Sequence, residues 1–186
     1  MKAFLNREWS AIRRLVKRPI RKDVAAVAAV EFAIILPVMI TMYLGGAEIS
    51  RAVTVQRKIS HVASVMGDLV AQSFAVSDAD IDGIFEAADA IMYPYTLNLP
   101  KLTVAGVSID SGSNPSFAWT KSKNGGATID LGEIPTSMLQ PDTFLVVAAS
   151  SYEYTPNFGE SFASSYTLKG QFYLHPRAGN EVEYVN

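Results

Sequence analysis

An apolar run near the beginning of the chain sharply narrows the possible folds. Residues 24–45 read VAAVAAVEFAIILPVMITMYLG, which is 22 residues with one charged side chain, Glu31. An α-helix rises about 1.5 Å per residue, so this run measures about 33 Å and can cross the ~30 Å hydrocarbon layer of a bilayer. We therefore predict a transmembrane helix over residues 24–45.

Two other interpretations of this run compete with a membrane helix. A helix buried in a soluble core is one, although no polar stripe of helical period interrupts the run. A cleavable secretory signal is the other, but its apolar region is usually only ~7–15 residues long. The segment that follows, Tyr43 to Glu48, is also a poor match to a small-residue cleavage site.

Charge is divided unevenly along the chain. Residues 1–23 hold eight basic and two acidic side chains, whereas the remaining residues hold eight basic and sixteen acidic ones. A basic arm can bind nucleic acid, but this arm adjoins an apolar run, and basic residues favour the cytoplasmic side of a membrane helix. We predict a basic cytoplasmic tail over residues 1–23, no nucleic-acid partner, and an exported domain over residues 46–186.

Helical spacing continues after the apolar run. It predicts one helix over about residues 24–71, whose second half packs on its own domain. A second helix is predicted over residues 77–92, with Ser77 as its N-cap. The apolar positions of the first helix beyond the membrane are Ile49, Val53, Ile59, Val62, Met66, Leu69 and Val70.

The rest of the domain alternates with a period of two, which is typical of strands. Together with the two helices, these strands predict an α+β fold in which a small antiparallel sheet packs against helices that precede it. We expect a turn at 124–126, a short helical turn near 135–139 and a hairpin connection at 157–160. The predicted strands are residues 102–109, 117–123, 143–154 and 164–174.

The apolar segment also carries a specific motif. Residues 28–37 read AAVEFAIILP, and Gly46, Glu48 and Arg51 follow with the spacing G-x-E-x-x-R. This pattern resembles the TadE/TadG-like proteins, which are pseudopilins or minor pilins of the tight-adherence (Flp, type IVb-like) pilus. The resemblance covers about residues 20–70, and residues 173–177 are similar to the C-terminal strand of that family.

The resemblance implies a pseudopilin-like fold and a structural role in pilus assembly and adhesion. It implies an inner-membrane protein with a cytoplasmic N-terminus, a periplasmic or extracellular domain and an association with the pilus. The implied partners are membrane lipid, other pilins or pseudopilins, the Tad inner-membrane platform and a prepilin peptidase.

The resemblance also assigns roles to residues of the apolar segment. It implies cleavage between Ala26 and Val27, which places Glu31 at the fifth mature position, where it can neutralise the terminal amine of a neighbouring subunit. Pro37 is expected to kink the helix. The family has glycine where this chain has Ala26, so an uncut, single-pass membrane-anchored binding module is the alternative function.

One acidic run offers a metal-binding alternative. The run from Asp78 through Asp80 and Asp82 to Gly83 begins like an EF-hand calcium loop, but Asp89 occupies the twelfth position, where a bidentate glutamate is preferred. The competing interpretation is an acidic first turn of the second helix. We expect no metal site and keep the calcium loop as the alternative.

No other pattern predicts a reaction. The chain has no cysteine, which excludes disulfides and thiolate chemistry. The two histidines, His61 and His175, lack ligand spacing, and a hydrolytic pair of Glu153 and Glu160 would need a cleft. We therefore expect no enzyme activity and no cofactor, with a membrane-tethered hydrolase as a remote alternative. Among the late aromatic residues, the run 152–156 is expected to be the most exposed.

Overall fold

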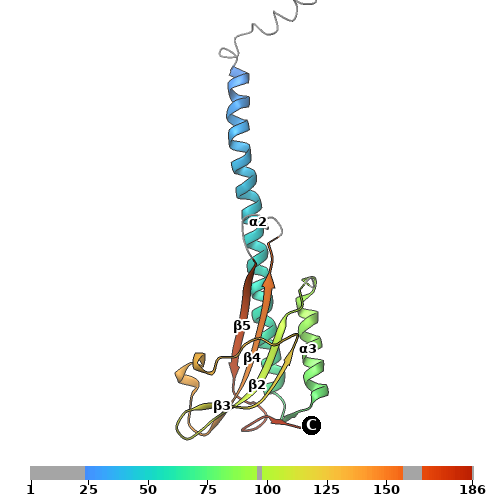
Figure 1. The fold of residues 1–186 in the computed structure, drawn as a ribbon, viewed down its shortest axis with the longest axis vertical. Helices are drawn as coiled ribbons and strands as arrows, with labels where there is room; N and C mark the ends of the chain where they lie inside the picture. The colour runs from blue at the N-terminus through green and yellow to red at the C-terminus, as the bar shows by residue number, and fades with distance from the viewer. Residues whose placement is uncertain (1–23, 96–97, 157–164, 186) are drawn as a thin grey trace, which may run out of the picture. The chain divides into compact units, whose positions relative to one another are not determined.

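A helix of 48 residues, α2 (Val24–Ala71), opens the part of the chain that the computed structural model describes, residues 24–95, 98–156 and 165–185 (Figure 1). The helix has the bounds that its spacing predicts. The chain divides into two compact units, Met1–Ala47 and Glu48–Asn186, and each is described separately below.

In the first unit, α2 presents apolar side chains outward. Phe32, Ile34 and Met42 are 61%, 67% and 74% exposed. No part of the most apolar 18-residue window of this helix is buried, so the structure contradicts the interpretation as a buried core helix. Exposure of this much apolar surface to water is unfavourable. The helix is long and apolar enough to cross a membrane, which indicates single-pass anchoring.

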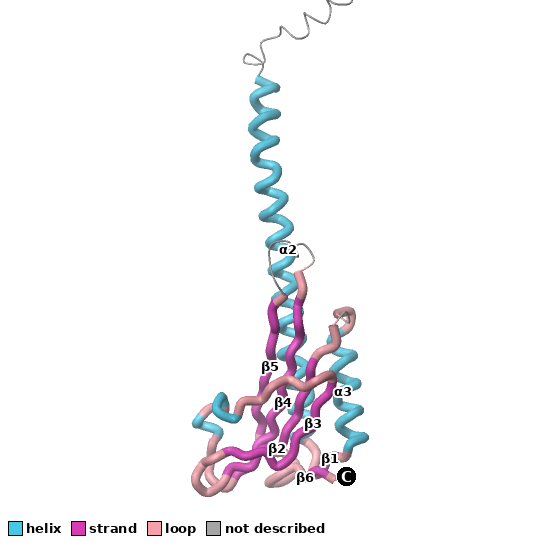
Figure 2. Tube along the Cα trace, in the orientation of Figure 1, coloured by secondary structure: helices cyan, strands magenta, loops and turns pink. Residues whose placement is uncertain are grey.

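The second unit is an α+β domain, as predicted (Figure 2). The C-terminal part of α2 and a second helix, α3 (Asp78–Met92), lie beside a four-stranded antiparallel sheet whose strand order is β3-β2-β4-β5. Two short 3-10 helices connect β3 to β4, and the second of them lies within the predicted turn at 135–139. The strands are β2 (Lys101–Ile109), β3 (Pro115–Lys123), β4 (Thr143–Tyr154) and β5 (Tyr166–Leu174).

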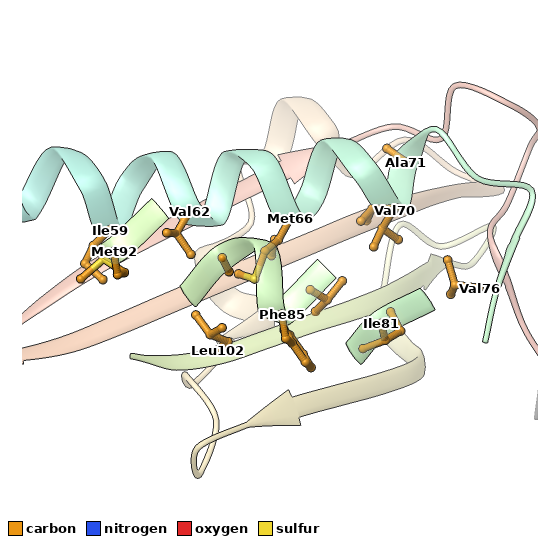
Figure 3. Packing of buried hydrophobic residues seen from close by; sticks show 14 of the residues in the cluster. Ile59, Val62, Met66, Val70, Ala71, Val76, Ile81, Phe85, Met92 and Leu102 are labelled. Carbon is orange, nitrogen blue, oxygen red and sulfur yellow. The ribbon is translucent and has the colours of Figure 1, made fainter. Parts of the chain in front are cut away.

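The main core lies between the two helices and one face of the sheet (Figure 3). Ile59 and Met66 of α2 and Phe85 of α3 are buried against Leu102 and Val146 of the central strands. A smaller cluster on the opposite face is formed around Leu145 and covered by the segment that connects β3 to β4. The core therefore fixes the C-terminal half of α2 on its own domain, as the helical spacing predicts.

Three predicted residues of α2 lie outside its buried stripe, and Val55, which was not predicted, lies within it. Ile49, Val53 and Leu69 are 67%, 45% and 39% exposed, whereas Val55 is fully buried. Positions 55, 59, 62 and 66 follow a spacing of four, three and four and therefore share one face. At about 100° of rotation per residue, Ile49 and Val53 point well away from that face and Leu69 lies at its edge, so the domain covers a narrower strip of the helix than the sequence suggested.

Glycines allow the helix to approach the sheet closely. A Cβ atom built on Gly170 of β5 would lie 2.8 Å from Cα of Ser60 and 3.0 Å from the carbonyl oxygen of Ile59. The Ser150 hydroxyl of β4 donates a hydrogen bond of 2.8 Å to the same Ile59 carbonyl. Backbone atoms of α2 thus touch the sheet directly, and only glycine fits at position 170.

Helix α3 is capped at both ends. Ser77 is the N-cap as predicted: its side chain accepts a hydrogen bond from the Asp80 amide, and the Asp80 carboxylate accepts one from the Ser77 amide. At the other end, Lys58 Nζ of α2 donates to the carbonyl oxygens of Ile91 and Tyr93, at 2.8 and 2.5 Å. The lysine charge complements the negative end of the helix dipole and joins the two helices.

The C-terminal segment of the chain forms contacts with the rest of the domain that we did not predict from the sequence. Two short strands, β1 (Ala75–Val76) and β6 (Glu183–Tyr184), pair in parallel. The Arg177 amide donates to the carbonyl of Ala71 at 2.7 Å, and Trp119 Nε1 donates to the carbonyl of Val182 at 2.8 Å. Residues 175–185 therefore tie the end of α2 to strand β3.

One expectation about the late aromatic residues is wrong. Tyr152 and Tyr154 are each only 6% exposed, because their alternation along β4 directs both rings to the face covered by α2. Tyr166 and Phe172 of β5 are the more exposed aromatics, at 40% and 37%. The predicted hairpin connection at 157–160 lies outside the described residues, although β4 and β5 pair as a hairpin requires.

Candidate functional site

The residues predicted to act in assembly lie on the membrane helix. Ala26, Val27, Glu31 and Pro37 all belong to α2, and Glu31 is exposed. Val27 and Glu31 are four residues apart and therefore lie on one face of the helix. The helix includes Pro37 and continues to Ala71. The Thr41 hydroxyl donates to the Pro37 carbonyl at 2.8 Å, which satisfies a polar group within the apolar segment.

The exposed carboxylate of Glu31 stands in an apolar surface. Insertion of a charged side chain at the centre of a membrane helix costs about 2.5–3.5 kcal/mol, so residues of this kind usually face a partner or a polar cavity. No described side chain of the same unit forms an ion pair with Glu31. Its position thus suits electrostatic pairing with a cation.

The G-x-E-x-x-R residues lie where α2 enters the domain. The Tyr154 hydroxyl of β4 donates a hydrogen bond to Glu48 Oε1, and the Tyr154 ring lies 5.3 Å from the Tyr166 ring between centroids. Burial and the Glu48 carboxylate raise the pKa of Tyr154, and Arg51 lowers it to a smaller extent. Glu48 therefore attaches the beginning of the stalk, which is the part of α2 within the domain (residues 48–71), to strand β4 of the sheet.

Replacement of Tyr154 by phenylalanine tests this contact. The hydrogen bond to a carboxylate is worth about 1.5–3 kcal/mol, so Tyr154→Phe is expected to lower the free energy of unfolding by about 2 kcal/mol. The raised pKa keeps the folded protein's hydroxyl protonated, so its stabilising effect is complete below pH ~10 and decreases as the pH rises further. Urea unfolding of the full chain in detergent at pH 8 and pH 11 measures both effects. Equal stability of the two proteins at pH 8 would exclude the contact.

Three of the four acidic residues of the calcium-loop alternative (Asp78, Asp80 and Asp89) form other contacts. Asp78 and Asp89 form ion pairs of 2.8 Å with Lys121 and Lys123 of β3. The hydrogen bond from Lys121 lowers the pKa of Asp78, and that from Ser77 lowers the pKa of Asp80. Within the described part of the chain, no three or more acidic, histidine or cysteine side chains are arranged to hold a metal ion.

The remaining candidate residues are dispersed. His61 on α2 and His175 after β5 are both exposed. The Glu153 carboxylate accepts a hydrogen bond of 2.9 Å from the Ser165 hydroxyl, and Glu160 lies outside the described residues. The structure thus gathers polar side chains into ion pairs and helix caps. The contact between Glu48 and Tyr154 escaped sequence reasoning because it joins residues 106 positions apart.

These features define a class: a single-pass anchored protein whose apolar helix carries one carboxylate and continues into a small α+β domain. Comparison with known families narrows this class of protein. Residues 26–65 match the family model described as TadE-like protein, which confirms the predicted resemblance over the apolar helix and the stalk. The matched segment includes Glu31, Pro37 and Glu48, and it supports an association with the Tad pilus in general. No curated protein and no solved structure matches the chain.

Proposed function

We propose that this protein is a TadE-like minor pilin or pseudopilin, a structural component of Tad (Flp) pilus assembly and adhesion. The observation that carries the proposal is the TadE-like match over a helix whose apolar surface is unburied and holds one carboxylate. A membrane anchor alone needs only apolar side chains. A costly glutamate within that surface is better explained by pairing with a neighbouring subunit.

The charge pattern supports an orientation for the anchor. The basic tail of residues 1–23 remains in the cytoplasm, and residues 46–186 lie on the other side of the inner membrane, in the periplasm or on the pilus. Basic side chains near the ends of a membrane helix are the strongest sequence determinant of its direction. The exported domain performs no reaction of its own and serves assembly through its surface.

We also propose that the chain is processed, as the resemblance to TadE-like proteins implies. A prepilin peptidase would cut between Ala26 and Val27 on the cytoplasmic side and release the basic tail. The new amine of Val27 and the carboxylate of Glu31 on a neighbouring subunit would then neutralise each other within the apolar helix bundle. Each charge alone is unfavourable there, so pairing would also fix the axial offset between subunits.

The natural absence of cysteine provides a clean test of orientation. Single cysteines are introduced by Ser10→Cys in the tail and by Ser113→Cys in the turn that precedes β3. In intact spheroplasts of a strain without prepilin peptidase, which keep the tail on the chain, a membrane-impermeant maleimide is expected to label position 113 and to label position 10 only after lysis. If the tail is labelled first, the proposed orientation is wrong. Equal labelling of both positions before lysis would exclude a single span.

A further inference from the structure

A groove lies on the face of the sheet opposite α2 and α3. Along β2, Thr103 alternates with the core residues Leu102 and Val104 and therefore points to the other face. Three adjoining cavities of about 530, 180 and 410 Å³ open on this face. The first and second share the segment 126–128, and the second and third share Lys101 and Ser151. Together they form one continuous groove.

The wall of the groove is held in place by hydrogen bonds. Asn124 Nδ2 donates a hydrogen bond to the carbonyl oxygen of Pro100 at 2.9 Å. The Gly126 amide donates one to the carbonyl oxygen of Lys123 at 3.1 Å. Gly126 has a φ of 70°, and a Cβ atom there would lie 3.1 Å from the hydroxyl oxygens of Thr103 and Ser122. The chain thus turns tightly over the sheet and encloses part of its polar surface before any ligand arrives.

The middle of the groove is basic. Lys101, Ser151 and Lys169 are paired across β2, β4 and β5, so they form one row on the same face. Lys121 and Lys123 are neutralised by aspartates of α3. By contrast, no carboxylate among residues 24–95, 98–156 and 165–185 forms an ion pair with either lysine of the row. These two charges stand out in a chain whose net charge is negative.

Hydroxyl and amide groups surround the two lysines, and an aromatic ring lies at one end. Phe117 of β3 lines the largest cavity and is 48% exposed. Glu153 lines the third cavity, at the opposite end of the groove from Phe117. The exposed hydroxyls that line the groove beside them are those of Thr120, Thr128 and Thr167. Asn98, Thr103, Ser122 and Gln171 also line it, and their side chains form hydrogen bonds within the protein.

We propose that this groove binds a segment of an acidic polysaccharide. The hydroxyl and amide groups match the hydroxyls of sugar rings, Lys101 and Lys169 match an acidic substituent, and Phe117 offers an apolar surface to the C–H face of a ring. Strand addition, one of the recurring modes of peptide recognition, uses the free backbone groups of a sheet edge. On the face of a sheet those groups are already paired, so recognition depends on side chains. This inference is independent of the role in pilus assembly.

Calorimetric titration of the full chain, held in phosphatidylcholine nanodiscs, tests the proposal. The acidic probe is hexagalacturonate, with maltohexaose as the neutral glycan and hexaglutamate as the acidic peptide. The double variant Lys101→Gln/Lys169→Gln and the single variant Phe117→Ala remove the two proposed contacts. Arg57→Gln, which removes an exposed positive charge on α2, is the matched control.

Hexagalacturonate is expected to bind at least tenfold more tightly than either control probe, and added salt is expected to weaken its binding. The double lysine variant and Phe117→Ala should each lose tenfold or more, while Arg57→Gln keeps the affinity. Unchanged melting temperatures are expected because Lys101, Lys169 and Phe117 are exposed. Absence of binding, equal binding of hexaglutamate, stronger binding of maltohexaose, or insensitivity to these substitutions would overturn the proposal.

Discussion

Glu31→Ala is expected to abolish association between subunits while leaving insertion into the membrane intact. A charged carboxylate opposes insertion by about 2.5–3.5 kcal/mol at the centre of a membrane helix and by less nearer the interface, so removal of Glu31 makes insertion easier. The same substitution leaves the amine of a neighbouring subunit without its counter-charge in an apolar environment, which is strongly unfavourable. Disulfide crosslinking of an Ile34→Cys/Val38→Cys reporter measures association in membranes of cells with an active prepilin peptidase, because these two positions are offset by the same four residues as Val27 and Glu31.

Two control variants separate charge from shape. Glu31→Gln keeps the size of the side chain and is expected to behave like Glu31→Ala, because the charge is what the partner requires. Glu86→Ala removes an exposed carboxylate from α3 and is expected to crosslink like the parent protein. Normal crosslinking of both Glu31 variants would exclude the proposed pairing. Loss of membrane insertion in either would show that Glu31 serves the fold of the anchor.

Gly170→Val is expected to give the largest loss of stability in the domain, about 3 kcal/mol. Its Cβ would meet backbone atoms of Ser60 and Ile59 at 2.8–3.0 Å, and backbone atoms of a helix cannot move aside as a flexible side chain can. The helix would have to separate from β5 and expose part of the core. Urea unfolding of the full chain in a mild detergent measures the change in free energy of unfolding.

Substitution of a second glycine serves as a control, because it is expected to raise the free energy of unfolding. Gly83 lies inside α3, and a Cβ atom there would meet nothing within 4 Å. Gly83→Ala is therefore expected to stabilise the protein by about 0.5–1 kcal/mol through helix propensity alone. If Gly170→Val retained the parent stability, close contact between α2 and the sheet would not be what holds the stalk in place.

Local patterns predicted most elements of the fold. The bounds of α2, the Ser77 cap of α3 and the alternation of the four long strands all depend on neighbouring residues in the sequence. Contacts between distant residues were missed, including the short pairing of β1 with β6 and the bond from Trp119 to Val182. A strand of two residues has too few positions for its period to be recognised.

The candidate site divides in the same way. Glu31 was identified from sequence because a charge in an apolar run is conspicuous. The partner of Glu48 was not identified from the sequence, and Tyr154 was assigned to an exposed run. The register of a strand decides which of its side chains face α2, and a local pattern does not fix that register. The row of Lys101, Ser151 and Lys169 also requires the register of three strands.

The N-terminal sequence of the protein extracted from membranes tests the proposed pilin role most directly. The chain is expressed with and without an active prepilin peptidase, and the first residues of the extracted protein are determined. The proposal predicts that the mature chain begins at Val27 when the peptidase is active and retains residues 1–26 when it is inactive. A chain that keeps its basic tail in both strains, or one that begins near Ala47, would contradict it.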